Sequence, residues 1–282
     1  MQLRQTSLLG TIILAGILLG GCGAHSKAAH RSNSSTIQAA AKSTQASAKS
    51  QQRTNQYANW RRVKKVKLPI LMYHSISTGN SLRVPAKEFR AQMAYLKQHH
   101  YDTLTTNQAV YALKHNRVPQ KKIVWITLDD SYKDNMTRAW PILKNNGQHA
   151  TINFITGFAN KPNHLSLTDA QKMKASGNVD FQSHTVRHLD LNDLTYQVQL
   201  TELTSSKKWL DKNLHQRTRV ICYPAGRADG ETIKADKAAG YTCALSTAAG
   251  IATSSQNPYN LTRQRVVPGM TTSAFAALLQ TN

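Results

Sequence analysis

The stretch KKIVWITLDD (121–130) decides the fold, because a strand-like apolar run leads directly into two carboxylates. Short apolar runs rich in β-branched and aromatic residues predict strands. Five further runs of this kind alternate with helical patterns, which is typical of β/α units around a parallel sheet or barrel. The predicted strands are LPILMYHSI (68–76), KKIVWITLDD (121–130), HATINFIT (149–156), NVDFQSHT (178–185), RVICYPAG (219–226) and YTCALST (241–247).

Two segments between these strands have the apolar periodicity of amphipathic helices. One is PAKEFRAQMAYLKQHH (85–100), and the other is NDLTYQVQLTELTSSKKWLDKNL (192–214). Asn192 or Asp193 is the expected N-cap of the second helix. No internal repeat or second domain boundary follows Leu68, so the sequence predicts one α/β domain close to the usual size of a β/α barrel.

Composition and charge exclude several classes of protein. The chain has 282 residues, of which 40% are apolar, with 14 Gly, 8 Pro and 3 Cys, so collagen-like, wholly disordered and disulfide-framework classes are excluded. The formal net charge is +22, and residues 1–67 carry 11 Lys and Arg but no acidic residue. Such a charge fits nucleic acid, an anionic membrane or an acidic envelope polymer, and charge alone does not choose among them.

The N-terminus has the order of a secretory signal. Arg4 precedes the apolar run LLGTIILAGILLGG, which is short for a membrane span, and Cys22 follows. The residues before Cys22 resemble a bacterial lipobox, which implies that Cys22 becomes a lipidated N-terminus. The alternatives are a plain signal peptide and an uncleaved anchor. We therefore expect an exported protein that is lipid-anchored to the outer face of the cell membrane.

The segment after Cys22 reads as a tether, because residues 23–59 contain too few large apolar residues to form a core. A basic cluster, RRVKKVK (61–67), follows; it is either a solvated junction or a contact for anionic polymers or headgroups. The expected domains are a lipoprotein signal peptide (1–21), a lipidated cysteine with a flexible basic tether (22–66), and a catalytic domain (67–282).

Polar side chains follow two of the predicted strands where functional residues of β/α proteins gather. Asp129 and Asp130 end one strand, although a paired Asp is also a common helix cap. His184 and His188 stand four residues apart at the end of another, and can face one metal ion if the segment turns helically. Two His and one carboxylate make a facial triad, and the spare carboxylate beside it suits a general base for hydrolysis.

These motifs resemble those of the polysaccharide deacetylases, carbohydrate esterase family 4, in the family's order over residues 68–282. ITLDDSYKDN is similar to the T-F-D-D-G motif, SHTVRH to H-[ST]-x-x-H, and ICYPAGR to R-x-P-Y-G. ATINFI resembles the A-T-F-F strand. LPILMYHSI and NLTRQRVV resemble the branch that includes poly-N-acetylglucosamine deacetylases. The resemblance implies a single distorted or incomplete (β/α) barrel.

The resemblance also implies a role for each matching residue. Asp129 would be the catalytic base, and the backbone N–H of Ala225 would stabilise the oxyanion. Asp130, His184 and His188 would hold one divalent metal, commonly zinc, with cobalt, nickel, iron or manganese as alternatives.

The catalytic acid has to come from elsewhere than usual, because the family's late L-x-H motif is missing from this sequence. In the branch that the chain resembles, the His of L-M-Y-H fills this role, which points to His74. The alternative is a histidine of the core.

Four positions depart from the family pattern: Leu128, Ser131, Cys222 and Ala225. Cys222 replaces the Arg that orients the catalytic Asp in many relatives. We expect Arg263 to supply a replacement guanidinium.

The leading hypothesis is a metal-dependent hydrolase that removes N-acetyl groups from N-acetylglucosamine units of an extracellular or cell-wall polysaccharide. Poly-N-acetylglucosamine is favoured and peptidoglycan comes next. The alternative is a weak or inactive sugar-binding module on the same fold. Nucleic-acid binding is not expected, because export separates the protein from that ligand and no basic stretch is interleaved with aromatic residues. The excess Lys and Arg suits an anionic envelope polymer, and the pairing of Cys222 with Cys243 stays open.

Overall fold

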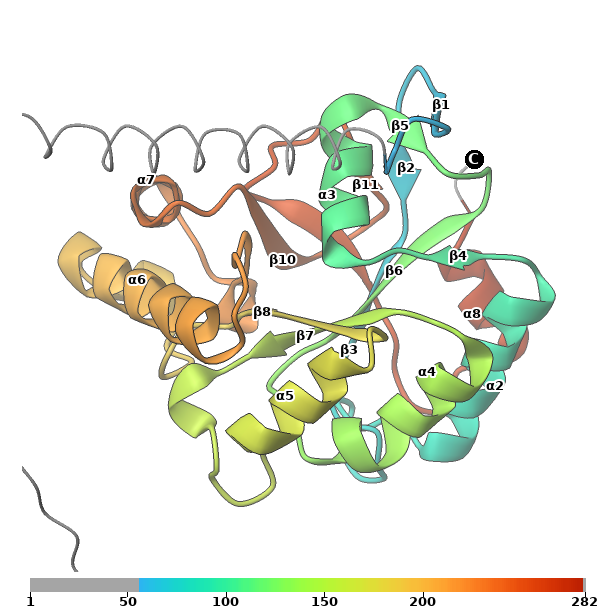
Figure 1. The fold of residues 1–282 in the computed structure, drawn as a ribbon, viewed down its shortest axis with the longest axis horizontal. Helices are drawn as coiled ribbons and strands as arrows, with labels where there is room; N and C mark the ends of the chain where they lie inside the picture. The colour runs from blue at the N-terminus through green and yellow to red at the C-terminus, as the bar shows by residue number, and fades with distance from the viewer. Residues whose placement is uncertain (1–55, 281–282) are drawn as a thin grey trace, which may run out of the picture. The chain divides into compact units, whose positions relative to one another are not determined.

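A computed structural model describes residues 56–280, and its centre is a closed barrel of seven parallel strands (Figure 1). Around the barrel the order is β3, β12, β10, β9, β8, β7 and β6, and pairing of β6 with β3 closes the ring. The predicted α/β barrel is confirmed, and it is incomplete in having one strand fewer than the common eight-stranded form. The strands are β3 (Ile70–Tyr73), β6 (Ile123–Leu128), β7 (Ala150–Phe154), β8 (Val179–Ser183), β9 (Val220–Cys222), β10 (Cys243–Ala249) and β12 (Leu261–Arg265).

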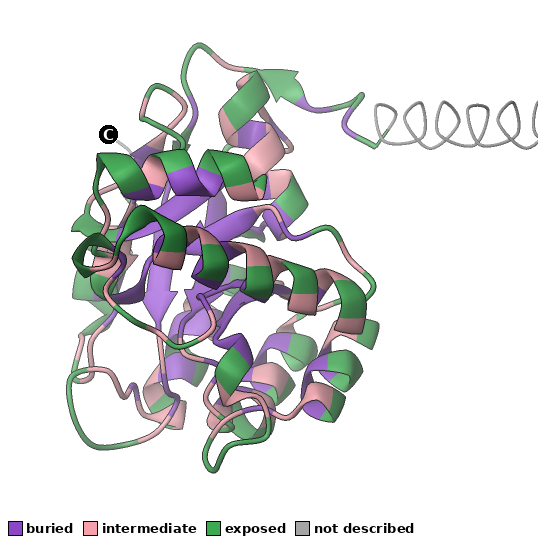
Figure 2. Ribbon diagram, turned by 90° about the vertical axis from the view of Figure 1, so that its left-hand side faces the viewer, coloured by how far each residue is buried: buried purple, intermediate pink, exposed green. Residues whose placement is uncertain are grey.

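Helices cover the outside of the barrel, and Figure 2 shows buried strands surrounded by helices whose outward faces are exposed. This arrangement explains why the strands read as continuous apolar runs: every residue of β6 and of β7 is buried. The α-helices are α2 (Ala86–Gln98), α3 (Thr106–His115), α4 (Trp140–Asn146), α5 (Leu167–Ala175), α6 (Tyr196–Asn213), α7 (Gly230–Ala239) and α8 (Thr272–Leu278).

The two predicted helices are confirmed, and their buried stripes pack on the barrel. Phe89, Met93 and Leu96 of α2 are fully buried in the main core. The expected N-cap of α6 is wrong, because Asn192 and Asp193 belong to a preceding 3₁₀ turn (Leu191–Asp193) and the helix begins after Thr195.

The base of the barrel is closed by the segment that leads into it. Tyr57 and Trp60 are buried, and their rings contact Tyr111 of α3. Short strands continue this closure in two antiparallel pairs, one of β1 with β5 and one of β2 with β11. The remaining short strands are β1 (Arg61–Arg62), β2 (Lys67–Leu68), β4 (Asp102–Thr103), β5 (Arg117–Val118) and β11 (Ala252–Thr253).

Residues 57–66, which the expected domain division assigns to the tether, pack against the barrel. The compact unit begins at Tyr57, because burial of the Tyr57 and Trp60 rings ties residues 57–66 to the domain. Cys22, the predicted signal peptide and most of the predicted tether lie outside the described residues. Within residues 56–280 no helix has the length and apolar character needed to cross a bilayer.

Sequence reasoning missed the seventh strand, β12, because LTRQR carries two arginines and no apolar run. Its first four residues alternate between buried and half-buried positions, Arg265 is exposed, and Arg263 points into the barrel with no exposed surface. The open question of the cysteines is answered by two free, buried thiols, Cys222 and Cys243.

Candidate active site

The candidate site lies at the carboxyl ends of the barrel strands. His74 directly follows β3, Asp129 follows β6, and His184 follows β8. Strands β3 and β6 are hydrogen-bonded neighbours, and the Asp129 amide continues their ladder by donating to the Tyr73 carbonyl at 2.8 Å. Parallel strands end on the same side, so residues far apart in the sequence meet at one rim.

Asp130, His184 and His188 form a compact group. Asp130 Oδ1 lies 3.3 Å from His184 Nε2 and 3.3 Å from His188 Nε2. The two imidazole rings have centroids 4.7 Å apart and planes at 78°, so their edges converge on the same space. One donor atom from each of the three residues lies within 4.8 Å of the others, which is the set and spacing that a divalent ion needs.

The chemistry of these donor atoms fits a metal. His184 Nδ1 lies 2.7 Å from the Cys222 carbonyl oxygen, which can only accept, so Nδ1 carries the proton and Nε2 keeps its lone pair for an ion. Asp130 Oδ1 is buried and has no hydrogen-bond donor, an arrangement that is costly without a cation. Asp130, His184 and His188 are therefore the residues that could hold a metal.

The loop that carries His188 is not helical, so the two imidazoles meet without the helical turn expected from the spacing. Thr185 and His188 both adopt left-handed backbone angles, with φ of 64° and 59°. Glu202 of α6 holds this turn: its Oε2 accepts from the Val186 and Arg187 amides, each at 2.9 Å, and its Oε1 from Arg187 Nε at 2.6 Å. Sequence reasoning missed Glu202, since one Glu on a polar helix carries no distinguishing signal.

Asp129 is buried and is held by a guanidinium. Arg263 Nη1 and Nη2 donate to Asp129 Oδ1 and Oδ2 at 2.9 and 2.8 Å, a bidentate pair. Asn153 Nδ2, from the middle of β7, also donates to Oδ1 at 2.7 Å. Burial alone would raise the pKa of Asp129, but the charge and hydrogen bonds of Arg263, together with the nearby His74 and His184, outweigh burial and hold that pKa well below its usual range. Asn153 was also missed; its only signal is an amide within an apolar strand.

Cys222 lies beside this pair. Its Sγ accepts from Arg263 Nη2 at 3.2 Å and lies 3.6 Å from Asp129 Oδ2. Asp129, His184 and Cys222 form a second group with metal-ligand spacing. The Arg263 guanidinium already contacts two of its members, so a further cation does not fit there.

His74 also lies near Asp129. Its Nε2 is 3.9 Å from Asp129 Oδ2, and its side chain is 15% exposed, so it borders the site rather than the closed core. Asn135 Nδ2 holds the backbone beneath it by donating to the His74 carbonyl at 2.9 Å. Burial lowers the pKa of His74, against the opposing effect of the nearby Asp129 and Asp130 charges.

Ala225 is exposed in the turn that follows β9 and has a left-handed φ of 51°. Its carbonyl accepts from Thr247 Oγ1 at 3.2 Å. Gly226 must follow it, because a Cβ at that position would lie 2.7 Å from the Thr247 amide nitrogen. The turn is therefore fixed in place above the end of β9.

Backbone strain is concentrated at the site. Asp130 and Ser131 have φ of 70° and 52°, both in the left-handed region. The Gly that the family motif has in place of Ser131 would adopt such an angle more easily. Left-handed non-glycine residues persist only where the surroundings hold them, and they cluster at functional sites.

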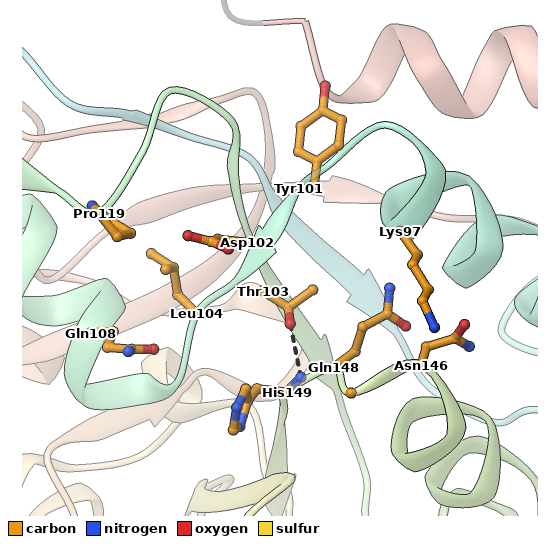
Figure 3. Close-up of a pocket in the computed structure, with 11 residues that line it drawn as sticks. Lys97, Tyr101, Asp102, Thr103, Leu104, Gln108, Pro119, Asn146, Gln148 and His149 are labelled. Atoms are coloured by element: carbon orange, nitrogen blue, oxygen red, sulfur yellow. Dashed lines mark hydrogen bonds between the residues drawn. The ribbon is translucent and has the colours of Figure 1, made fainter.

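A separate cavity of about 340 Å³ contains none of these residues (Figure 3). It lies near the start of β6 and β7, between β4 and the turn before β7, where the His149 amide donates to Thr103 Oγ1 at 2.9 Å. This is the end of the barrel opposite the candidate site.

The closed β/α barrel with its rim of carboxylates and imidazoles defines the class of the protein, and the comparisons give the family. The polysaccharide deacetylase family model matches residues 116–244. The YxkH protein of Bacillus subtilis (strain 168), whose name assigns it to the polysaccharide deacetylases, is 46% identical over 217 residues, 77% of each chain. The chain therefore belongs to the polysaccharide deacetylase family and is a deacetylase, a hydrolase.

More distant relatives and solved structures agree. A poly-beta-1,6-N-acetyl-D-glucosamine N-deacetylase of Staphylococcus aureus (strain MSSA476) is 27% identical over 73% of this chain and 76% of its own. The Streptococcus pyogenes deacetylase PplD, solved with acetate, superposes with a TM-score of 0.74 and 35% identity over 77% of this chain and all of that one. The polysaccharide deacetylase BC0361 of Bacillus cereus has a TM-score of 0.70 and 28% identity over 77% of this chain and 70% of its own.

Proposed function

We propose that the protein is a metal-dependent N-deacetylase that acts on N-acetylglucosamine units of an extracellular or cell-wall polysaccharide. The observation that carries this proposal is the placement of Asp130, His184 and His188 around one point, beside the buried Asp129 and Arg263 pair. Deacetylases of this family are metal-dependent. Zinc is the favoured ion, with cobalt, nickel, iron or manganese as alternatives.

Asp130, His184 and His188 would hold the ion. When bound, it would supply Lewis-acid polarisation of the acetamide carbonyl and acidify an adjacent water. Asp129 is ionised at neutral pH and accepts the proton of the attacking water, so the base is always in its active form. Its two hydrogen bonds from Arg263 fix the direction of the carboxylate.

The tetrahedral oxyanion accepts a hydrogen bond from the backbone N–H of Ala225, whose position is fixed by the turn at Gly226. His74 then donates a proton to the leaving amine. A lowered pKa makes its imidazolium a ready donor, and its Nε2 lies 3.9 Å from Asp129 Oδ2, close to the base but without a direct hydrogen bond to it. Asp129 then releases the proton of the water to solvent, and His74 takes one up from solvent for the next cycle.

Two substrates deserve direct comparison. Likeness to the poly-N-acetylglucosamine deacetylase branch favours β-1,6-linked N-acetylglucosamine, and peptidoglycan comes next. The test is acetate release from both polymers by the purified protein after metal removal and zinc reloading. Zinc-dependent release that disappears in Asp129→Asn, with zinc still bound to that variant, supports the proposal. Release that persists in Asp129→Asn, or that is unaffected by stripping the metal, would overturn it.

We also propose that the protein is exported and anchored through a lipid on Cys22, which would place it against acetylated polysaccharide and anionic envelope polymers. Mass spectrometry of the membrane-extracted protein should find a diacylglyceryl group on Cys22 as the first residue. Cys22→Ser should leave unprocessed protein without lipid, whereas an unmodified Cys22 in the wild type contradicts the anchor.

A further inference from the structure

A cavity of about 480 Å³ opens on the same rim as the candidate active site. Its walls come from the segments that follow β3, β6 and β7, the first two of which also carry His74, Asp129 and Asp130. The lining residues that matter here are Ser77, Arg83, Tyr132, Lys133, Arg138 and His164.

One wall of the cavity is formed by the residues that directly follow Asp130 in the chain. Tyr132 stands two residues after Asp130 and forms an isolated bridge with His164. The Lys133 amide donates to the Asn163 carbonyl at 2.8 Å, and the Leu165 amide donates to the Ser131 carbonyl at 2.9 Å. A group bound in this cavity is therefore a neighbour of whatever occupies the reaction centre.

The cavity is positively charged. Arg83 Nη1 donates to Ser77 Oγ at 3.2 Å and Arg138 Nη1 to the Ile76 carbonyl at 3.1 Å, but across residues 56–280 neither guanidinium forms an ion pair. Lys133 is neutralised by Asp169, 2.5 Å away.

One carboxylate, Asp134, also lines the cavity. Its two oxygens accept from Ser75 Oγ at 2.6 Å and from the Ile76 amide at 2.9 Å and pair with neither Arg83 nor Arg138, so the two guanidiniums outnumber this one carboxylate. Two guanidiniums without a carboxylate partner, fixed to the rim by oxygen acceptors, are the donors that a carboxylate or phosphate prefers.

An aromatic surface adjoins these charges. The rings of Tyr132 and His164 stack with centroids 5.6 Å apart and planes at 21°. The C–H face of a sugar ring is apolar and packs on such a surface, while its substituents reach the cations beside it.

We propose that this cavity is a subsite for a sugar unit that bears a carboxylate or a phosphate, next to the N-acetylglucosamine unit that is deacetylated. The inference rests on the proposed function and sharpens it: the preferred substrate is an anionic polymer. Likeness to relatives favours neutral poly-N-acetylglucosamine, whereas this cavity favours a charged wall polymer, and the two rankings are tested against each other.

The test uses matched substrates. One is a peptidoglycan oligosaccharide with free lactyl carboxylates; the second is the same oligosaccharide with those carboxylates converted to methyl amides. The third is an N-acetylglucosamine oligomer that bears a glycerol phosphate on the neighbouring unit. A charge-assisted hydrogen bond predicts a preference for a charged substrate of roughly 10- to 100-fold in kcat/KM, mostly through KM. Comparison of the first and third substrates then tells carboxylate from phosphate.

Arg83→Gln and Arg138→Gln should each lower the ratio of kcat/KM for the charged substrate to kcat/KM for the amidated substrate toward one. Arg90→Gln is the matched control, because Arg90 is exposed on α2 and does not line the cavity, and it should keep the full preference. Equal kcat/KM for charged and amidated substrates in the wild type, or a preference that survives in Arg83→Gln/Arg138→Gln, would overturn the subsite.

Binding of the same oligosaccharides, measured by calorimetry, separates this inference from the proposed function. Tighter binding of the charged form that is lost in Arg83→Gln, without acetate release, would keep the subsite and overturn the deacetylation. Acetate release without any charge preference in rate or affinity would do the reverse.

Discussion

Arg263→Ala is the substitution whose effect follows most directly from the structure. It removes both hydrogen bonds from Asp129, at 2.9 and 2.8 Å, and leaves a carboxylate with 3% side-chain exposure without its counter-charge. Removal of one partner of a buried ion pair costs about 3–5 kcal/mol. Should Asp129 take up a proton instead, the same energy corresponds to a rise in its pKa by about 2 to 4.

Urea unfolding at pH 7 measures the first effect, and the pH dependence of acetate release measures the second. Wild-type Asp129 has a lowered pKa, so the stability it contributes is present at neutral pH and is lost only as the pH falls below the ordinary Asp range. In Arg263→Ala the acid limb of the rate profile should move upward. An unchanged midpoint of unfolding together with an unchanged rate profile would refute the reasoning.

A swap provides the sharper version of this experiment. Cys222 Sγ lies 3.2 Å from Arg263 Nη2, so an arginine at 222 can place its guanidinium in nearly the same space. Cys222→Arg/Arg263→Ala should be at least roughly tenfold more active than Arg263→Ala alone. Arg263→Lys keeps the charge but cannot make the bidentate contact, and serves as the control for geometry. If the double variant is no better than Arg263→Ala, the two positions are not interchangeable.

Three further predictions concern the acid, the metal loop and a buried carboxyl. His74→Ala should bind zinc normally but lose roughly 100-fold or more in turnover, as removal of a general acid predicts. Turnover equal to that of the wild type would show that His74 is not the general acid. Glu202→Ala frees the Val186 and Arg187 amides, so zinc affinity measured by competition with a chelator should fall roughly 10- to 100-fold, and unchanged affinity would show that the loop holds itself. Asp236 is buried in α7, and burial raises its pKa to about 7, so its contribution to stability falls as the pH rises from about 4 to 7. Asp236→Asn should remove this loss, which amounts to up to about 4 kcal/mol in thermal or urea unfolding at pH 8. Parallel curves of stability against pH for the two proteins would contradict this prediction.

The barrel strands and the polar residues at their ends could be predicted from the sequence, because each corresponds to a short pattern of neighbouring residues. A buried parallel strand is an apolar run, and a carboxylate or imidazole at its end has no packing explanation. The residue pairs Asp129–Asp130 and His184–His188 are adjacent or nearly so in the chain. Their grouping needed only the rule that parallel strands end together.

The residues that position these side chains could not be predicted in this way. Arg263 stands 134 positions from Asp129, and a pattern of five residues with two arginines gives no sign that one of them points into a barrel. It was proposed only from a family resemblance and a missing Arg. Glu202 and Asn153 are isolated polar residues of a helix and a strand, and register and helix rotation decide which polar residue faces the site.

The segment that enters the barrel and the reactive side chains lie at its two opposite ends. Tyr57 and Trp60 pack with Leu68, Ile123 and Val220, at the strand starts, whereas the reactive side chains stand at the strand ends. The entering segment, residues 57–66, is therefore packed at the end of the barrel opposite the reactive side chains, and it leaves the reactive rim uncovered.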